Sequence, residues 1–246
     1  MLTTVIDLVE DVARDLPALQ PTTPPADLDD LMARFAEVDA PIAERLLDRL
    51  GGGQAGDEWS PTADGWVVDA LDGAVTYLQG LPQWCVSVTL VREGEPVLAV
   101  LHAPALGETY AAEAGRGAWR DGRVIAPSAK TDLRAAVAAT SQPPALTPQP
   151  EAFARAGAAL PGVLARVAAV RNLGPTSWQV ADVASGRLDF FWEYGLDAGN
   201  LLGGALIARE AGAVVTTVDG RRWTAAEGSF LVAGPGLHAI AQRILC

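Results

Sequence analysis

The stretch WVVDALDGAVTYLQG, residues 66–80, decides how the rest of this chain is interpreted. Its apolar beginning indicates a buried strand, and the residues after Gly73 indicate a short helix. Asp69 and Asp72 lie where the strand ends, on either side of Leu71. If the strand unwinds there, the two carboxylates and the Leu71 carbonyl oxygen can converge on one hard cation such as Mg²⁺. The stretch therefore predicts either a metal site or a strand that simply ends in a turn.

The residues after Asp72 add a candidate anion site. Gly73 permits close approach of the backbone, and the N–H groups of Gly73 and Ala74 open the predicted helix. Metal and phosphate would then meet at a single turn. The simpler alternative is that Asp72 caps this helix and Asp69 is solvated at the strand end.

The composition of the chain restricts its partners. Half of the 246 residues are hydrophobic, and 30 acidic against 18 basic residues give a formal charge of −12. That charge repels nucleic acids and anionic membranes, so we expect a small-molecule substrate and neither of those partners. Cys85 and Cys246 are too few for a disulfide framework or a thiolate metal cluster. Because the chain lacks a signal-type N-terminus and a long apolar run, we expect a cytoplasmic protein.

The spacing of apolar residues changes along the chain. Two amphipathic helices are predicted in the first 50 residues, followed by a glycine-rich polar loop. Strands with tight turns come next, at residues 66–71, 85–91, 96–103 and 108–114, which predicts an antiparallel meander. Helices and strands then alternate, with helices at 151–160, 176–185, 200–213 and 236–245 and strands at 164–170, 187–194, 214–218 and 229–233. The pattern predicts a layered α/β fold, with residues 1–132 and 133–246 as two halves of one compact unit.

Three segments, residues 66–91, 100–125 and 183–215, together resemble the inositol monophosphatase family. These are Mg²⁺-dependent, lithium-sensitive phosphatases related to fructose-1,6-bisphosphatase. The first segment is similar to the family's D-P-I/L-D-G-T stretch, the second to its hairpin with a G-x-G-A pattern, and the third to its E-x-G-L-x-x-W-D stretch. The resemblance implies a layered α/β sandwich of the inositol monophosphatase and fructose-1,6-bisphosphatase type, and a homodimer.

The resemblance also implies a set of metal ligands. Asp69, the Leu71 carbonyl and Asp72 match the family's intact ligand segment. The family's G-E-E glutamate, which binds metal and helps to orient the attacking water, is replaced by Asp57 in Gly56-Asp57-Glu58. Glu58 would substitute for it after a loop shift. The simpler alternative is that Asp57 and Glu58 are solvated loop residues.

Two departures from the family pattern predict a weakened site. The threonine of D-G-T is Ala74, which has no hydroxyl to position water, and the aspartate of the W-D pair is Asn200. Asn200 lends a carbonyl oxygen but no charge, so we expect one Mg²⁺ site, with the second weak or empty. Asp197, three residues earlier, would compensate only through a local rearrangement.

The predicted substrate contacts come from the same segments. Glu193 matches the family glutamate that contacts a substrate hydroxyl, although a buried or capping glutamate is an equally simple interpretation. Gly73, Ala74 and Asn200 complete the predicted binding residues. Asp39 is the only recognisable acid of the family's K-x-D-x-V-T-x-x-D segment.

Three functions are compatible with these residues. The first is a Mg²⁺-dependent phosphomonoesterase for a small hydroxylated phosphate, weakened at Ala74 and Asn200. The second is a repurposed biosynthetic enzyme that uses the clustered carboxylates as general acid or base, because carboxylates without cations raise one another's pKa. The third is a non-catalytic binding homologue.

Overall fold

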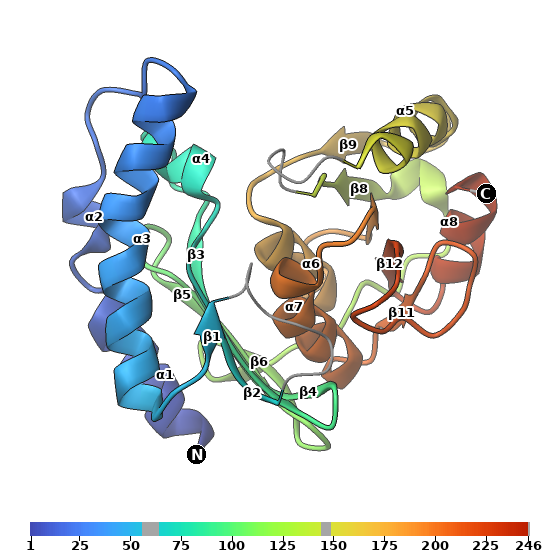
Figure 1. Ribbon diagram of the computed structural model, residues 1–246. Coiled ribbons are helices and arrows are strands. Elements are labelled where there is room, and N and C mark those ends of the chain that lie inside the picture. The colour runs from blue at the N-terminus through green and yellow to red at the C-terminus, as the bar shows by residue number, and fades with distance from the viewer. Residues whose placement is uncertain (56–63, 144–148, 246) are drawn as a thin grey trace.

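The computed structural model describes residues 1–55, 64–143 and 149–245. Layers of helices alternate with two β-sheets (Figure 1). One helical layer covers the outer face of the first sheet, a second lies between the sheets, and a third covers the outer face of the second sheet. The chain is thus a layered α/β sandwich, as predicted from the sequence.

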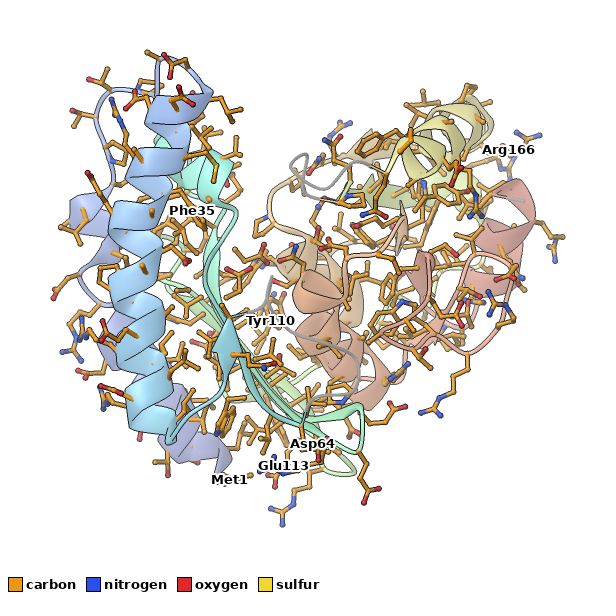
Figure 2. The ribbon with its side chains drawn as sticks, viewed as in Figure 1. Met1, Phe35, Asp64, Tyr110, Glu113 and Arg166 are labelled. Atoms are coloured by element: carbon orange, nitrogen blue, oxygen red, sulfur yellow. The ribbon has the colours of Figure 1, made fainter. Side chains whose placement is uncertain are left out.

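The N-terminal helices cover the first sheet. They are α1 Leu2–Ala13, α2 Leu16–Leu19 and α3 Leu28–Leu50. Asp27 starts α3 by accepting a 2.9 Å hydrogen bond from the Asp30 N–H, and Gly51 ends it at φ 82°, a conformation that glycine adopts without strain. Phe35 points from α3 toward the first sheet (Figure 2), where it packs against the buried core.

The first sheet is the predicted meander, extended at both edges. Its strands lie in chain order: β1 Gln54–Ala55, β2 Gly65–Asp72, β3 Cys85–Arg92, β4 Glu95–Ala103, β5 Glu108–Glu113, β6 Gly117–Arg120 and β7 Arg123–Val124. All pairs are antiparallel except β1 with β2. The sequence did not predict β1, β6 and β7, because strands of two to four residues have too little periodicity to be recognised.

The second sheet is mixed and has the order β11-β12-β10-β8-β9. Its strands are β8 Val137–Thr140, β9 Ala169–Arg171, β10 Phe190–Tyr194, β11 Val214–Thr216 and β12 Ser229–Ala233. The strand predicted at 164–170 is mostly wrong, because α5 Pro150–Leu164 ends where it was placed and β9 is only three residues long. The sequence also missed β8, whose two alanines have little strand propensity.

Helices α6 Thr176–Ala184 and α7 Ala198–Glu210 lie between the sheets, while α5 and α8 His238–Leu245 cover the second sheet. Tyr110 of β5 reaches across to α6, where its hydroxyl donates a 2.8 Å hydrogen bond to Asp182 (Figure 2). No helix in the described part of the chain is long and apolar enough to cross a membrane.

Two glycines in α7 allow this close packing, and their replacement tests it. A Cβ on Gly203 would lie 2.7 Å from the Thr89 hydroxyl oxygen, inside van der Waals contact. We expect Gly203→Ala to lower the free energy of unfolding by ~1–3 kcal/mol, measured by urea denaturation. The matched control is Gly157→Ala in α5, where an added Cβ meets nothing within 4 Å. That variant should be neutral or slightly stabilising. Equal destabilisation by both would contradict the packing argument.

Candidate functional site

A β-bulge at the end of β2 brings the two aspartates of the opening motif to one face of the sheet. Asp69 is paired with Ser87 and Asp72 with Cys85, so Ala70 and Leu71 together face one residue of β3. In a regular strand, residues three apart point to opposite faces. The extra residue of the bulge shifts this alternation by one position, so Asp69 and Asp72 point to the same face. Both carboxylates therefore point toward the helices between the sheets.

Asp72 is held by α6. Its Oδ2 accepts a short hydrogen bond from the Ser177 hydroxyl, and Cys85 Sγ lies 3.9 Å from the same oxygen. The Ser177 backbone N–H also donates to Asp72, so this carboxylate caps the first turn of α6. Burial raises the pKa of the Cys85 thiol, which keeps it protonated and able to donate.

Asp72 does not cap the helix that directly follows it. That helix, α4 Ala74–Leu78, begins at Gly73 with φ 91° and has no side-chain cap. A Cβ at Gly73 would lie 3.0 Å from both the Gln83 carbonyl oxygen and the Thr76 hydroxyl oxygen, so glycine is needed there. The Thr76 hydroxyl is already engaged with the Gly73 and Gln83 carbonyl oxygens. It therefore does not replace the hydroxyl missing at Ala74.

Glu193 of β10 approaches the same end of α6 from the second sheet. It is 1% exposed, and its Oε2 lies 3.4 Å from the Thr176 hydroxyl. Consecutive residues of α6, Thr176 and Ser177, thus hold one carboxylate from each sheet. The other oxygen of Glu193, Oε1, is buried and has no hydrogen-bond donor among the described residues.

Asp197 is the fourth acid of the site, and with Asp72 and Glu193 it is one of the three that are buried. It is 7% exposed and immediately precedes α7. Its Oδ1 accepts a 2.7 Å hydrogen bond from the Asn200 side-chain amide, while Oδ2 is buried without a donor in the described structure. That Asp197 compensates for Asn200 only through a local rearrangement stays a prediction, but the start of α7 already directs its carboxylate toward Asp69 and Asp72.

These four acids form an acidic cluster, defined as Asp69, Asp72, Glu193 and Asp197. Burial raises the pKa of Asp72 to about 7 and that of Asp197 to about 6. The pKa of Asp69 and that of Glu193 are raised well above the usual range, first by burial and then by the neighbouring carboxylates. Asp39 of α3 adds to the effect on Asp69.

The acidic cluster has the chemistry of a cation site. After burial, the carboxylates of neighbouring acids are what raises the pKa of Asp69 and of Glu193. A bound cation would neutralise the charge of these carboxylates. Among the described residues, no three His, Cys, Asp or Glu side chains are arranged so that together they could hold a metal ion as they stand. Mg²⁺ is commonly held by one or two carboxylates and keeps several waters, so Asp69, Asp72 and the Leu71 carbonyl at the bulge fit it. The predicted ligands Asp57 and Glu58 lie outside the described residues.

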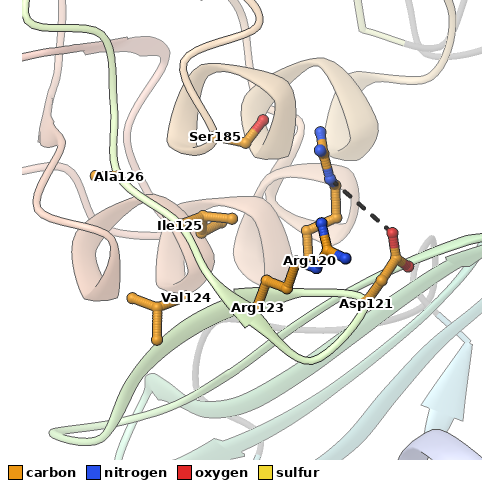
Figure 3. Close-up of a pocket in the computed structure, with 7 residues that line it drawn as sticks. All are labelled: Arg120, Asp121, Arg123, Val124, Ile125, Ala126 and Ser185. Atoms are coloured by element: carbon orange, nitrogen blue, oxygen red, sulfur yellow. Dashed lines mark ion pairs between the residues drawn. The ribbon is translucent and has the colours of Figure 1, made fainter.

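Two hollows lie elsewhere on the described surface. The larger, about 540 Å³, is lined by Arg120, Arg123, Ser185 and neighbouring residues (Figure 3), and Arg120 lies 4.0 Å from Asp121 there. The smaller, about 280 Å³, lies beside Trp178 and Arg187. No residue predicted from the sequence to bind metal or substrate lines either hollow.

The sequence of residues 32–245 matches the inositol monophosphatase family. The chain belongs to this family. An inositol-1-monophosphatase of Mesorhizobium japonicum is 37% identical over 180 residues, 73% of this chain and 65% of the relative. A fructose-1,6-bisphosphatase/inositol-1-monophosphatase of Thermotoga maritima is 32% identical over 73% of this chain and 67% of its own length. The chain thus matches less than two thirds of the Mesorhizobium relative.

Solved structures of the inositol monophosphatase family have the same fold. The extragenic suppressor protein suhB of Bartonella henselae superposes with a TM-score of 0.83 at 25% identity, over 99% of this chain and 98% of that one. An IMPase of Thermotoga maritima gives 0.82 at 25% identity, over 99% and 96%. Another relative, from Neisseria meningitidis serogroup B, is called a putative Nus factor SuhB and is 32% identical over 73% of this chain and 68% of the relative.

The contacts made by α6 could not be found from the sequence of this family member. Ser177 lies 105 residues from its partner Asp72, and Thr176 belongs to an ordinary helical pattern. The spacing of residues in the sequence does not indicate that two hydroxyls in one helical turn form hydrogen bonds with carboxylates from two different sheets. Only the packing of α6 between the sheets brings these groups together.

Proposed function

We propose that this family member is a Mg²⁺-dependent phosphomonoesterase acting on a small hydroxylated phosphate. The observation that carries the proposal is the bulge that turns Asp69 and Asp72 to one face, where Glu193 and Asp197 approach them and the acids raise one another's pKa. Relatives named inositol-1-monophosphatase support it.

The residues divide into four roles under this proposal. Asp69, the Leu71 carbonyl and Asp72 would hold Mg²⁺, which when bound activates water and stabilises the leaving oxygen. The Ser177 hydroxyl and Cys85 hold Oδ2 of Asp72, and its Oδ1 would face the cation. Glu193 would bind a substrate hydroxyl, and the N–H groups of Gly73 and Ala74 would bind the phosphate. Asn200 would contact the rest of the substrate. Asp57 or Glu58 would orient the attacking water.

The oligomeric state of the protein, its location in the cell and its division into two halves are also proposed, by family resemblance. We expect a homodimer in the cytoplasm, with residues 1–132 and 133–246 as two halves of one compact unit. Light scattering after size-exclusion chromatography would measure the number of subunits directly.

Metal-dependent release of phosphate tests the proposed activity. A panel of inositol, sugar and nucleotide monophosphates should include one that is hydrolysed with Mg²⁺ and not with EDTA. Because Ala74 has no hydroxyl, we expect a turnover below a typical enzyme's ~10 s⁻¹.

Asp69→Asn should abolish that release, because it removes a charged ligand. The matched control is Asp64→Asn, the same substitution on an exposed residue at the start of β2. Its activity should equal that of the unsubstituted protein. Hydrolysis that persists in EDTA or in Asp69→Asn would show that the cluster does not bind the catalytic metal.

A repurposed enzyme is the second candidate, and the pKa values favour it. Asp72 at about 7 and Asp197 at about 6 would both exchange protons near neutral pH in metal-free protein. Such an enzyme would bind an unphosphorylated small molecule and release no phosphate from any member of the panel. A non-catalytic role, suggested by relatives named Nus factor SuhB, would leave both assays negative.

A further inference from the structure

Asn200 and Asp197 form one unit at the start of α7. Asn200 occupies the position where the resemblance expects a metal-binding aspartate, and its amide donates a 2.7 Å hydrogen bond to Asp197 Oδ1. An amide that donates through Nδ2 leaves the carboxylate ionised and fixes its orientation. The negative charge that an aspartate at position 200 would carry is therefore carried by Asp197, one helical turn earlier.

The side chain of Asp197 does not serve as a helix cap. Although Asp197 precedes α7, its carboxylate accepts no hydrogen bond from an N–H group of that helix. It is 7% exposed, and its Oδ2 has no donor within the described residues. Burying a carboxylate oxygen without a donor is unfavourable, so some other group is expected to satisfy it.

The free oxygen of Asp197 belongs to the acidic cluster. Glu193 Oε1 is also buried without a donor from any other residue of the described structure, and the carboxyl groups of Glu193 and Asp197 are hydrogen-bond partners of one another, which raises the pKa of Glu193. Asp197 also acts electrostatically on Asp69 and Asp72. Two acceptor oxygens can satisfy each other only through a proton or a cation between them. Because four acids share this space, a divalent cation neutralises more of their charge than one proton does.

We propose that Asp197 supplies the carboxylate of a second divalent-cation site, in place of the residue at position 200, and that Asn200 is its positioning residue. The inference rests on the proposed metal-dependent function. It alters the expectation from the sequence, since the second site retains its negative charge.

Calorimetric titration with MgCl₂ tests this inference without measuring activity. Asp197→Asn should raise the Kd for Mg²⁺ at the weaker site at least ~10-fold. The exchange variant Asp197→Asn/Asn200→Asp restores the net charge and moves the carboxylate to residue 200, and it should regain binding. The matched control is Asp27→Asn, which removes one charge from the start of α3, an exposed helix N-cap. It should leave both Kd values unchanged.

Thermal unfolding in EDTA provides a second readout. Asp197→Asn should raise Tm in EDTA, because it removes repulsion within the acidic cluster, and should reduce the further rise that Mg²⁺ produces. A lower Tm in EDTA would instead indicate a structural role for the carboxylate and would overturn the proposal.

The outcomes separate this inference from the proposed function. If Asp69→Asn abolishes Mg²⁺ binding while Asp197→Asn binds like the unsubstituted protein, the inference is wrong and the metal-dependent function stands. If the unsubstituted protein binds no Mg²⁺, both are wrong. Loss of one binding event in Asp197→Asn and its return in the exchange variant would support the inference.

Discussion

Ala74→Thr is expected to raise the phosphatase turnover of this protein by ~10²-fold, because it restores a hydroxyl beside the acidic cluster. Removing one preorganised hydrogen-bond donor from an active site typically lowers turnover by about that factor. Residue 74 is the first of α4 and half-buried, and the neighbouring Thr76 hydroxyl is already committed to backbone carbonyls. The Tyr77 hydroxyl donates to the Leu16 carbonyl oxygen, so no other hydroxyl of α4 is available for the role. Steady-state release of phosphate from the best substrate measures the effect.

Ala74→Val is the matched control for this gain. Valine has the shape of threonine without the hydroxyl, so it reproduces any effect of packing and none of the hydrogen bonding. We expect no gain from it. If threonine and valine give the same turnover, the hydroxyl is not what this site lacks.

The structure changes the expectation for the second departure from the family pattern. From the sequence, Asn200→Asp should also raise activity by restoring a ligand charge. With Asp197 already buried beside it, a new carboxylate would lose the 2.7 Å hydrogen bond and add repulsion. We therefore expect Asn200→Asp alone to give no gain, in contrast to the exchange variant.

The metal-free protein should lose stability as the pH rises from about 4 to about 7. Asp72 has its pKa raised from 3.8 to about 7 in the folded state, so the folded protein binds more protons than the unfolded chain in that range. The stabilisation is fully present below pH 4 and is lost as the pH rises through the folded pKa. A shift of that size corresponds to on the order of 4 kcal/mol. Asp197, raised to about 6, changes stability in the same direction.

Thermal unfolding in EDTA across this pH range measures the effect. For a chain of this length ~1 kcal/mol changes Tm by ~2–4 °C, so a fall of ~10 °C is expected. Saturating Mg²⁺ should reverse most of the fall at pH 7, because it binds the ionised carboxylates of the folded state. The control is Asp72→Asn, which does not titrate and should flatten the pH dependence. An unchanged profile in that variant would assign the effect to other acids.

Under the proposed function, the same carboxylates would oppose folding without a cation and would bind one when ionised. Asp69 and Glu193 have their pKa values raised in the same direction, and they lie where the two sheets pack against α6 and α7, Glu193 buried and Asp69 half-buried. A site of this kind is stable because its surroundings, including the Ser177 cap on Asp72, hold the acids in place.

The layered α/β fold and the candidate aspartates of the site could be predicted from local patterns in the sequence. Residues 66–80 carry the ligand segment, and the order of three such segments identified the layered α/β sandwich. These signals are local, since strand periodicity, turn residues and short motifs are encoded within a few neighbours. The departures at Ala74 and Asn200 are also visible in the sequence, because residue types are read position by position, while their effect on activity stays a prediction.

The arrangement of the carboxylates depends on long-range packing that no short stretch of sequence encodes. The bulge that turns Asp69 and Asp72 to one face depends on pairing with β3, and the hydroxyl that holds Asp72 comes from α6, 105 residues away. The orientation of Asp197 depends on where α7 begins, which its own neighbours in the sequence do not specify. Burial and charge act through space, so the pKa values that define this cluster arise only when the two sheets enclose it.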